Sequence, residues 1–209
     1  AGPVVDDEGL AQRFLQALHG GSSFWSGKPF YPLDIVAALA AVPRPRLLVT
    51  TPFHLAALLA AGIDLPPVDR VLSATAPLSA KLAGEAERRF GMPVHEIYGS
   101  TESGQIASRR TTAGAAWELF PGIRLEQQDG ATVASGGHVE GRVPLADVIE
   151  LLADGRFLLH GRHADLVNIA GRRTSLAYLN HQIGAVPGVV DAAFFLCRTS
   201  FSAASRVAP

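Results

Sequence analysis

Apolar and polar positions in the first half of the chain alternate between helical and extended patterns. Segments 7–18, 33–42, 52–61 and 78–90 have the apolar spacing and the proline or glycine boundaries of helices. Segments 46–51, 68–75 and 94–98 are short, apolar and rich in β-branched residues, which predicts strands. Pro32 and Pro52 stand where helices begin, and Ser79 stands where a side chain caps one. Strands that alternate with helices over short links predict a parallel sheet with right-handed crossovers.

The pattern changes after Thr101. Short strand-like runs follow at 105–109, 123–127, 131–135, 148–152 and 157–160, separated by glycine turns such as Asp129-Gly130 and Asp154-Gly155. They predict a small antiparallel β unit. From position 161 we expect a strand over 165–170, a turn at Gly171, a helix over 175–183 and a strand over 189–196.

The predicted fold class is therefore α/β, with three parts. A parallel-sheet subdomain over 1–110 and a small antiparallel β subdomain over 111–161 form one large domain. Residues 162–209 would then be the start of a small α+β C-terminal domain, since about 45 residues rarely fold alone.

Composition narrows the classes of protein. The 209 residues are 48% hydrophobic and 18% charged, which supports a packed core and excludes disordered and coiled-coil chains. A net charge of −1 gives no electrostatic signature of nucleic-acid binding. The single cysteine, Cys197, excludes a disulfide framework and a cysteine-rich zinc site.

The sequence shows no targeting signal and no membrane-spanning segment. The longest apolar run, 35–42, has eight residues, whereas a membrane span needs about 20. The acidic start of the chain lacks the order of a signal peptide. We expect a cytoplasmic protein with no membrane span and no nucleic-acid partner.

The first candidate site is the run Tyr98-Gly99-Ser100-Thr101-Glu102, expected just past the carboxyl end of a parallel strand, where ligands of α/β sheets bind. Hydroxyl and backbone N–H groups suit phosphate oxygens, and a carboxylate suits Mg²⁺. The alternative is an ordinary turn with a solvated Glu102, and the residue types alone favour that alternative.

Two further segments can contribute to a site. Small residues over 73–79 end the preceding strand at the same sheet edge and leave room for a flat ring, although this segment taken alone favours a simple turn capped by Ser79. Asp147 stands in an apolar stretch, where it either needs partners, such as sugar hydroxyls, or faces water at a strand edge.

Basic and imidazole side chains give weaker signals. Arg162, Arg172 and Arg173 suit phosphate or carboxylate groups, although a solvated turn around Gly171 is commoner. His160 and His163 are three apart in a strand-like stretch and would point to opposite faces, so we expect no metal site from histidine. The Ser-hydrolase elbow, the Walker phosphate loop and the dinucleotide glycine motif are absent.

Taken in order, these segments resemble the adenylate-forming superfamily of acyl-CoA synthetases, peptide-synthetase adenylation domains and luciferase. SATAPLS resembles the superfamily's strand-end loop on adenine, and YGSTE resembles its aromatic-Gly-x-Thr-Glu signature. Asp147, Asp154-Gly155 and Gly161-Arg162 keep the spacing of its later Asp, Asp-Gly and Gly-Arg block. The stretch 161–183 resembles the start of the mobile C-terminal domain, and the resemblance covers about 20–196.

The resemblance implies roles for the matching residues. Adenine would lie against Thr75, Ala76 and Pro77, with Tyr98 packed on it. Thr101, with Gly99 and Ser100, would bind the α-phosphate, and Glu102 would hold Mg²⁺, which makes Thr101 and Glu102 the catalytic pair. Asp147 would take the ribose hydroxyls, Arg162 and Arg173 would approach ribose and phosphate, and Ala170 and Gly171 would border the path of the thiol.

The implied reaction has two halves. A small carboxylic acid reacts with Mg-ATP to give an acyl-adenylate and pyrophosphate, and a thiol of CoA or an acyl carrier protein then displaces AMP. Three features depart from the superfamily: its phosphate loop and its catalytic lysine are not found, and the hinge position is Ala164, with Asp165 beside it. We expect chain 1–209 alone not to adenylate at a normal rate.

The alternative class is a non-catalytic nucleotide-binding or protein-interaction domain with the same fold. The missing lysine and phosphate loop favour it for this chain. Thr101, Glu102, Asp147 and Arg162 favour a site that still binds ATP.

Overall fold

The computed structural model describes Trp25, Gly27, residues 29–162, 166–169 and 172–176, and the single positions Leu179, Ile183, Val186, Val189, Phe194 and Phe195. The helix expected over 7–18 lies outside the described residues. Contacts divide the chain into two compact units, Ala1–Leu159 and His160–Pro209. The division at 110 and 161 stays a prediction.

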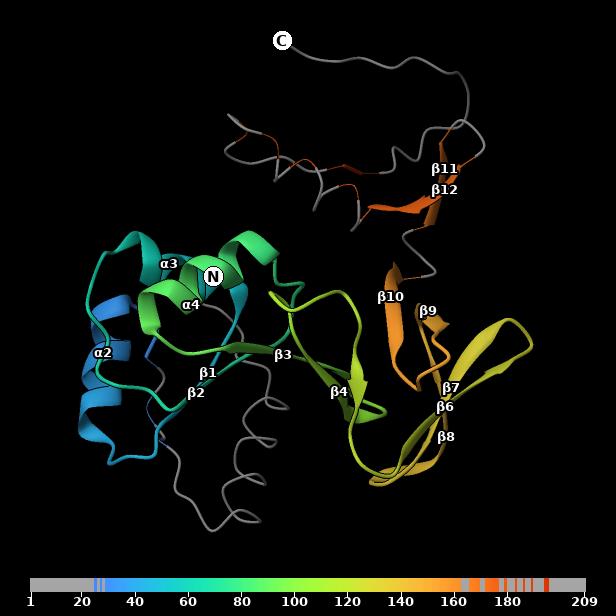
Figure 1. Cartoon of the computed structure of the whole chain (residues 1–209), viewed down its shortest axis with the longest axis horizontal. Coiled ribbons are helices and arrows are strands. Elements are labelled where there is room, and N and C mark those ends of the chain that lie inside the picture. Colours follow the sequence, from blue (N-terminus) through green and yellow to red (C-terminus); the bar gives the residue numbers. More distant parts are fainter. Residues whose placement is uncertain are drawn as a thin grey trace. The chain divides into compact units, whose positions relative to one another are not determined.

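Helices and parallel strands alternate at the start of the described chain (Figure 1). Their order is α2 (Pro32–Ala41), β1 (Leu47–Thr50), α3 (Pro52–Ala60), β2 (Arg70–Ser73), α4 (Ala80–Phe90) and β3 (Val94–Ser100). Strands β1, β2 and β3 are parallel neighbours, and β4 (Gly104–Arg110) and β5 (Glu118–Leu119) extend the sheet antiparallel. The predicted α/β class is confirmed.

Local signals in the sequence account for the helix ends. Proline opens α2 and α3, and the Ser79 hydroxyl accepts the Leu82 N–H at the start of α4. Gly91 ends α4 in the left-handed region, with φ 69°. The helices pack on one face of the strands through a core that includes Leu48, Leu55, Leu58, Val71, Ala83 and Val94.

The antiparallel unit that follows has its own core. Strands β6 (Ile123–Gln128), β7 (Ala131–Gly136) and β8 (Val139–Leu145) form one sheet, and β9 (Asp147–Leu151) pairs with β10 (Phe157–Arg162). The core contains Ile106, Ala107, Trp117, Ile123, Ala134, Val139, Leu145, Ile149 and Phe157. Ile106 and Ala107 come from β4, so this strand joins the parallel sheet to the antiparallel unit.

In the second unit, β11 (Leu166–Ile169) and β12 (Arg172–Ser175) form an antiparallel hairpin. Leu176, Leu179 and Ile183 are helical, in the region where a helix was expected. The strand expected over 189–196 is not found at its described positions, Val189, Phe194 and Phe195.

Three strands were missed by the sequence pattern: β5, β8 and β12. Strand β8 contains Gly141 and Pro144, which both weaken a strand signal. It lies at the sheet edge, where proline needs no ladder partner on its open side. Strand β12 occupies the region expected to be a turn, because its pairing with β11 decides its conformation.

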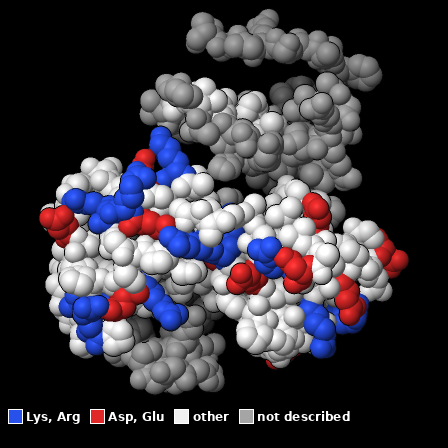
Figure 2. Space-filling view, viewed as in Figure 1, with Lys and Arg blue, Asp and Glu red and all other residues white. Residues whose placement is uncertain are grey.

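Surface charges are mixed. On the face shown in Figure 2, basic and acidic side chains lie interspersed. Ion pairs among the described residues include Arg110 with Glu87 and Arg142 with Glu126. This face therefore presents no large region of a single charge. Within the part of the chain that the structure describes, no helix has the length and apolar character needed to cross a bilayer.

Candidate functional site

Tyr98 lies in β3, within the strand expected over 94–98, and β3 continues through Gly99 and Ser100, which were expected just past the end of the strand. Strand β2 ends at Ser73, opposite Glu96, but β3 continues because β4 pairs with it antiparallel up to Ser100 and Gly104. Thr101, Glu102 and Ser103 form the tight turn between β3 and β4.

Two serines hold this turn. The Ser100 N–H donates to Ser103 Oγ at 3.1 Å, and the Ser103 N–H donates to Ser100 Oγ at 3.2 Å. Ser103 is buried and its hydroxyl also donates to the Gly104 carbonyl at 2.9 Å. The closed turn leaves Thr101 and Glu102 exposed at its tip.

Gly99 is required by close packing of the backbone. A Cβ atom at this position would lie 2.1 Å from the Gly104 carbonyl oxygen and 2.7 Å from Gln105 Cα. The bulge between Tyr98 and Gly99 produces this close approach. No side chain fits here without moving β4.

Glu102 is a charged group at neutral pH. Its own backbone N–H and the Ser100 hydroxyl lower the pKa of its carboxyl group. No group of three or more His, Cys, Asp and Glu side chains suited to a metal ion is found among the described residues. A cation at Glu102 would take its other ligands from water and a bound ligand, as Mg²⁺ commonly does.

Asp147 is joined to Tyr98. The Tyr98 hydroxyl donates a hydrogen bond of 2.8 Å to Asp147 Oδ2, across 49 residues of sequence. Asp147 begins β9 and is partly buried. Asp147 is therefore not fully exposed to solvent, and it has a protein partner.

Aromatic packing fixes the Tyr98 ring. Its centroid lies 5.6 Å from that of Trp117 and 5.7 Å from that of Phe157. Trp117 and Phe157 stack on each other at an interplanar angle of 11°, and both are buried. The Tyr98 ring is thus supported by rigid neighbours, and its hydroxyl points to Asp147.

The segment after β2 has a strained backbone. Thr75 has φ 76°, in the left-handed region that β-branched residues rarely adopt. Thr75, Ala76 and Pro77 are exposed, and the next residue, Leu78, is buried and donates its N–H to Glu96 Oε1 at 2.8 Å. Strained backbone conformations that are held in place by neighbouring residues are common at binding sites.

The β2–β3 register brings the sequence-predicted segments to one sheet edge. Because Ser73 pairs with Glu96, the 74–78 turn follows β2 at the edge where β3 continues through Tyr98 to Thr101. Asp147 joins them through its bond to Tyr98.

The remaining sequence-predicted residues belong to the second compact unit or to β10, which leads into it. The backbone of Arg162 ends β10, and that of Arg173 lies in β12. Ala170 and Gly171 lie outside the described residues.

Sequence reasoning missed Glu96, Ser103, Arg109 and Trp117. A signal for Glu96 was available. It stands two residues after Val94 in a strand, so its side chain lies on the same, buried face of the sheet. A charged residue at such a position is rare without partners.

A family model described as AMP-binding enzyme matches residues 9–139. The chain belongs to this family. A 4-coumarate–CoA ligase of Rhodobacter capsulatus is 30% identical over 153 residues, which are 73% of this chain and 38% of the ligase.

Solved structures share the fold at low identity. ATP-bound MatB from Rhodopseudomonas palustris superposes with TM-score 0.71 and 22% identity, over 92% of this chain and 45% of MatB. O-succinylbenzoate coenzyme A synthetase from Bacillus subtilis, in complex with AMP, superposes with TM-score 0.76 and 19% identity, over 92% of this chain and 46% of the synthetase. The chain thus spans less than half the length of each of these relatives.

Proposed function

We propose that this chain forms the nucleotide-binding part of an enzyme that activates a small carboxylic acid with Mg-ATP. The acid becomes an acyl-adenylate and then passes to a thiol of CoA or a carrier protein. The observation that carries the proposal is the Tyr98–Asp147 hydrogen bond, which joins the YGSTE strand to a distant carboxylate. Membership of the AMP-binding enzyme family supports the same class of ligand.

We assign the base and ribose first. The exposed run Thr75-Ala76-Pro77 offers small side chains to a flat adenine ring, and Tyr98 offers the aromatic face. The Asp147 Oδ2 atom accepts the Tyr98 hydroxyl, and no hydrogen bond to the other oxygen, Oδ1, is found among the described residues. That oxygen suits a ribose hydroxyl as donor.

We assign the phosphates and the cation to the turn. Thr101, beside Gly99 and Ser100, supplies a hydroxyl and backbone N–H groups for the α-phosphate. Glu102, ionised and exposed, would hold Mg²⁺ together with phosphate oxygens and water. When bound, Mg²⁺ neutralises phosphate charge that otherwise opposes attack by a carboxylate.

The chemistry needs positioning more than acid–base catalysis. A carboxylate oxygen of the acid attacks the α-phosphorus of ATP, and the bond between the α-phosphorus and the pyrophosphate oxygen breaks. Pyrophosphate leaves and the acyl-adenylate stays bound. In the second half, a thiolate attacks the acyl carbonyl carbon and AMP leaves. We propose that Arg162 and Arg173 serve ribose and phosphate, and that Ala170 and Gly171 border the thiol path.

Nucleotide titration tests the proposal. We expect chain 1–209 to bind AMP, measured by ligand-observed NMR or calorimetry, and Asp147→Asn to weaken binding about tenfold through loss of a charge-assisted hydrogen bond. Glu150→Gln, in the same strand, is the control. Absence of AMP and ATP binding at millimolar concentration would contradict the proposal.

A pyrophosphate-release assay addresses the non-catalytic alternative. In a longer form of this protein that contains a phosphate loop and a lysine, we expect acid-dependent release. For chain 1–209 we expect slow release. Nucleotide binding without release in that longer form would favour the alternative.

A further inference from the structure

Glu96 is a buried carboxylate with a full set of partners. It is 3% exposed, on the helix-facing side of β3. Its Oε1 accepts the Leu78 N–H at 2.8 Å. Its Oε2 accepts Arg109 Nε at 2.7 Å and the Thr111 hydroxyl at 3.0 Å. A buried charge is tolerated because each oxygen is hydrogen-bonded.

Arg109 continues this contact to the aromatic cluster. It lies directly opposite Glu96 across the β3–β4 pair, and a second nitrogen, Nη2, is 2.7 Å from Oε2. The guanidinium carbon stands 4.4 Å from the centroid of the Trp117 ring, a cation–π arrangement. Trp117 in turn packs against Tyr98.

Glu96 is therefore linked to both sides of the proposed base site, directly to one and through Arg109 and Trp117 to the other. Through Leu78 it holds the 74–78 turn, and through Arg109 and Trp117 it supports Tyr98. The turn needs such an anchor because Thr75 has φ 76°, and a strained backbone persists only where its surroundings hold it.

Glu87, in α4, provides a comparison with a similar set of partners. It too accepts a backbone N–H, from Val94 at 3.0 Å, together with an arginine, Arg110 at 2.8 Å, and a threonine, Thr112 at 3.0 Å. Its partners among the described residues lie in β3, at the end of β4 and in the turn after β4, and they include neither the 74–78 turn nor Trp117. The two carboxylates have similar types of partner, although the Glu96–Arg109 pair is more buried, and of the two only Glu96 bonds to the 74–78 turn.

We propose that Glu96 is a positioning residue that sets base selectivity. It holds the 74–78 turn and Tyr98 at the separation that a purine ring fills. This inference rests on the proposed function, since it assumes that a nucleotide binds between these two elements. Glu96 acts on the turn through Leu78 and on Tyr98 through Arg109 and Trp117, and it does not itself touch the nucleotide.

The test compares the dissociation constants of AMP and uridine 5′-monophosphate, which differ only in the base. We expect the wild-type chain to prefer AMP. We expect Glu96→Gln to reduce this preference about tenfold, because the neutral amide cannot form an ion pair with Arg109. Glu87→Gln, which removes an equivalent ion pair, should leave the preference unchanged. A loss of fold alone would weaken both nucleotides together.

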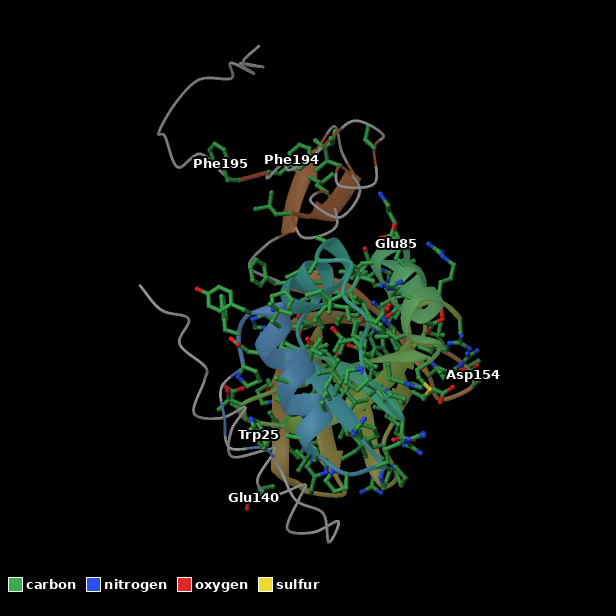
Figure 3. The ribbon with its side chains drawn as sticks, turned by 90° about the vertical axis from the view of Figure 1, so that its left-hand side faces the viewer. Trp25, Glu85, Glu140, Asp154, Phe194 and Phe195 are labelled. Carbon is green, nitrogen blue, oxygen red and sulfur yellow. The ribbon has the colours of Figure 1, made fainter. Side chains whose placement is uncertain are left out.

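A spectroscopic readout checks the Arg109 contact. The chain has two tryptophans, and exposed Trp25 (Figure 3) is replaced by Phe so that emission reports Trp117. We expect Glu96→Gln to change that emission and Glu87→Gln to leave it unchanged. If Glu96→Gln does not fold by circular dichroism, Arg109→Lys serves instead, since lysine keeps the charge but loses the planar stack on Trp117.

The outcomes separate the two proposals. If the wild type binds neither nucleotide, the proposed function fails and this inference fails with it. If the wild type binds AMP without preference over the uridine nucleotide, or if the preference survives Glu96→Gln and Arg109→Lys, the positioning role is wrong and nucleotide binding stands.

Discussion

The Tyr98 hydroxyl lies 2.8 Å from Asp147 Oδ2, so one hydrogen bond ties β3 to β9. The two residues come from strands in different sheets, and the Tyr98 ring packs against both Trp117 and Phe157. The bond therefore has both a structural effect, which can be measured without ligand, and a proposed role at the ribose.

Tyr98→Phe removes this bond and keeps the ring. We expect the free energy of unfolding to fall by about 1 kcal/mol, measured by urea denaturation, because Asp147 loses a partner while partly buried. Tyr31→Phe is the control, since Tyr31 is 68% exposed and should change stability little. Equal effects of the two substitutions would contradict a stabilising bond.

Gly99→Ala places a methyl group against β4. The added Cβ would lie 2.1 Å from the Gly104 carbonyl oxygen, so we expect a loss of about 3 kcal/mol in the free energy of unfolding. Gly84→Ala, in α4, is the contrast, because the nearest atom to the added Cβ would be 3.8 Å away. It should stabilise the helix by up to about 1 kcal/mol. Thermal unfolding of both variants measures the difference, and a tolerated Gly99→Ala would show that β4 can move.

Thr75→Gly relieves strain. Because φ at Thr75 is 76°, glycine adopts the conformation without a steric penalty, and we expect a gain of about 1 kcal/mol in unfolding free energy. Ala76→Gly, at the next exposed position, should give no such gain, since its φ is not in the left-handed region. Chemical denaturation of the two single variants measures both changes in unfolding free energy. A loss of stability in Thr75→Gly would contradict the strain argument.

Glu87 makes stability depend on pH. The Arg110 guanidinium, together with the Val94 N–H and Thr112, lowers the pKa of Glu87 from 4.5 to about 2. A lowered folded-state pKa means that the stabilisation is present above about 4.5 and is lost as pH falls toward 2.

We therefore expect the difference in unfolding free energy between wild type and Glu87→Gln to shrink as pH falls from 5 to about 2. Urea denaturation at a series of pH values measures it. Asp69, whose pKa is also lowered to about 2 by Arg44, contributes to both proteins and cancels in the difference. A constant difference across this range would show that Glu87 is not the group responsible.

Glu102→Gln should separate cation binding from nucleotide binding. The side chain is exposed, so stability should be unchanged, but we expect Mg²⁺-dependent ATP binding to weaken about tenfold from loss of one carboxylate ligand. AMP binding without Mg²⁺ should stay the same. Glu140→Gln, at an exposed position of β8 (Figure 3), is the control, and an equal effect there would argue against a cation at Glu102.

Part of this molecule was predictable from short stretches of sequence. Prolines and capping residues mark the starts of α2, α3 and α4, and Asp-Gly pairs mark the hairpin turns, because these signals act within a few residues. The same local order made the Tyr98-Gly99-Ser100-Thr101-Glu102 run and Asp147 visible as candidates.

Other features required the folded chain. The extension of β3 through Ser100, the Tyr98–Asp147 bond and the partners of Glu96 all depend on strand register and on residues far apart in sequence. Strand β8 shows the same limit, since Gly141 and Pro144 argue against a strand until the sheet edge is known. Local sequence determined where α2, α3 and α4 begin, and tertiary packing decided how far β3 extends and which side chains meet, because contacts between distant segments carry no local signature.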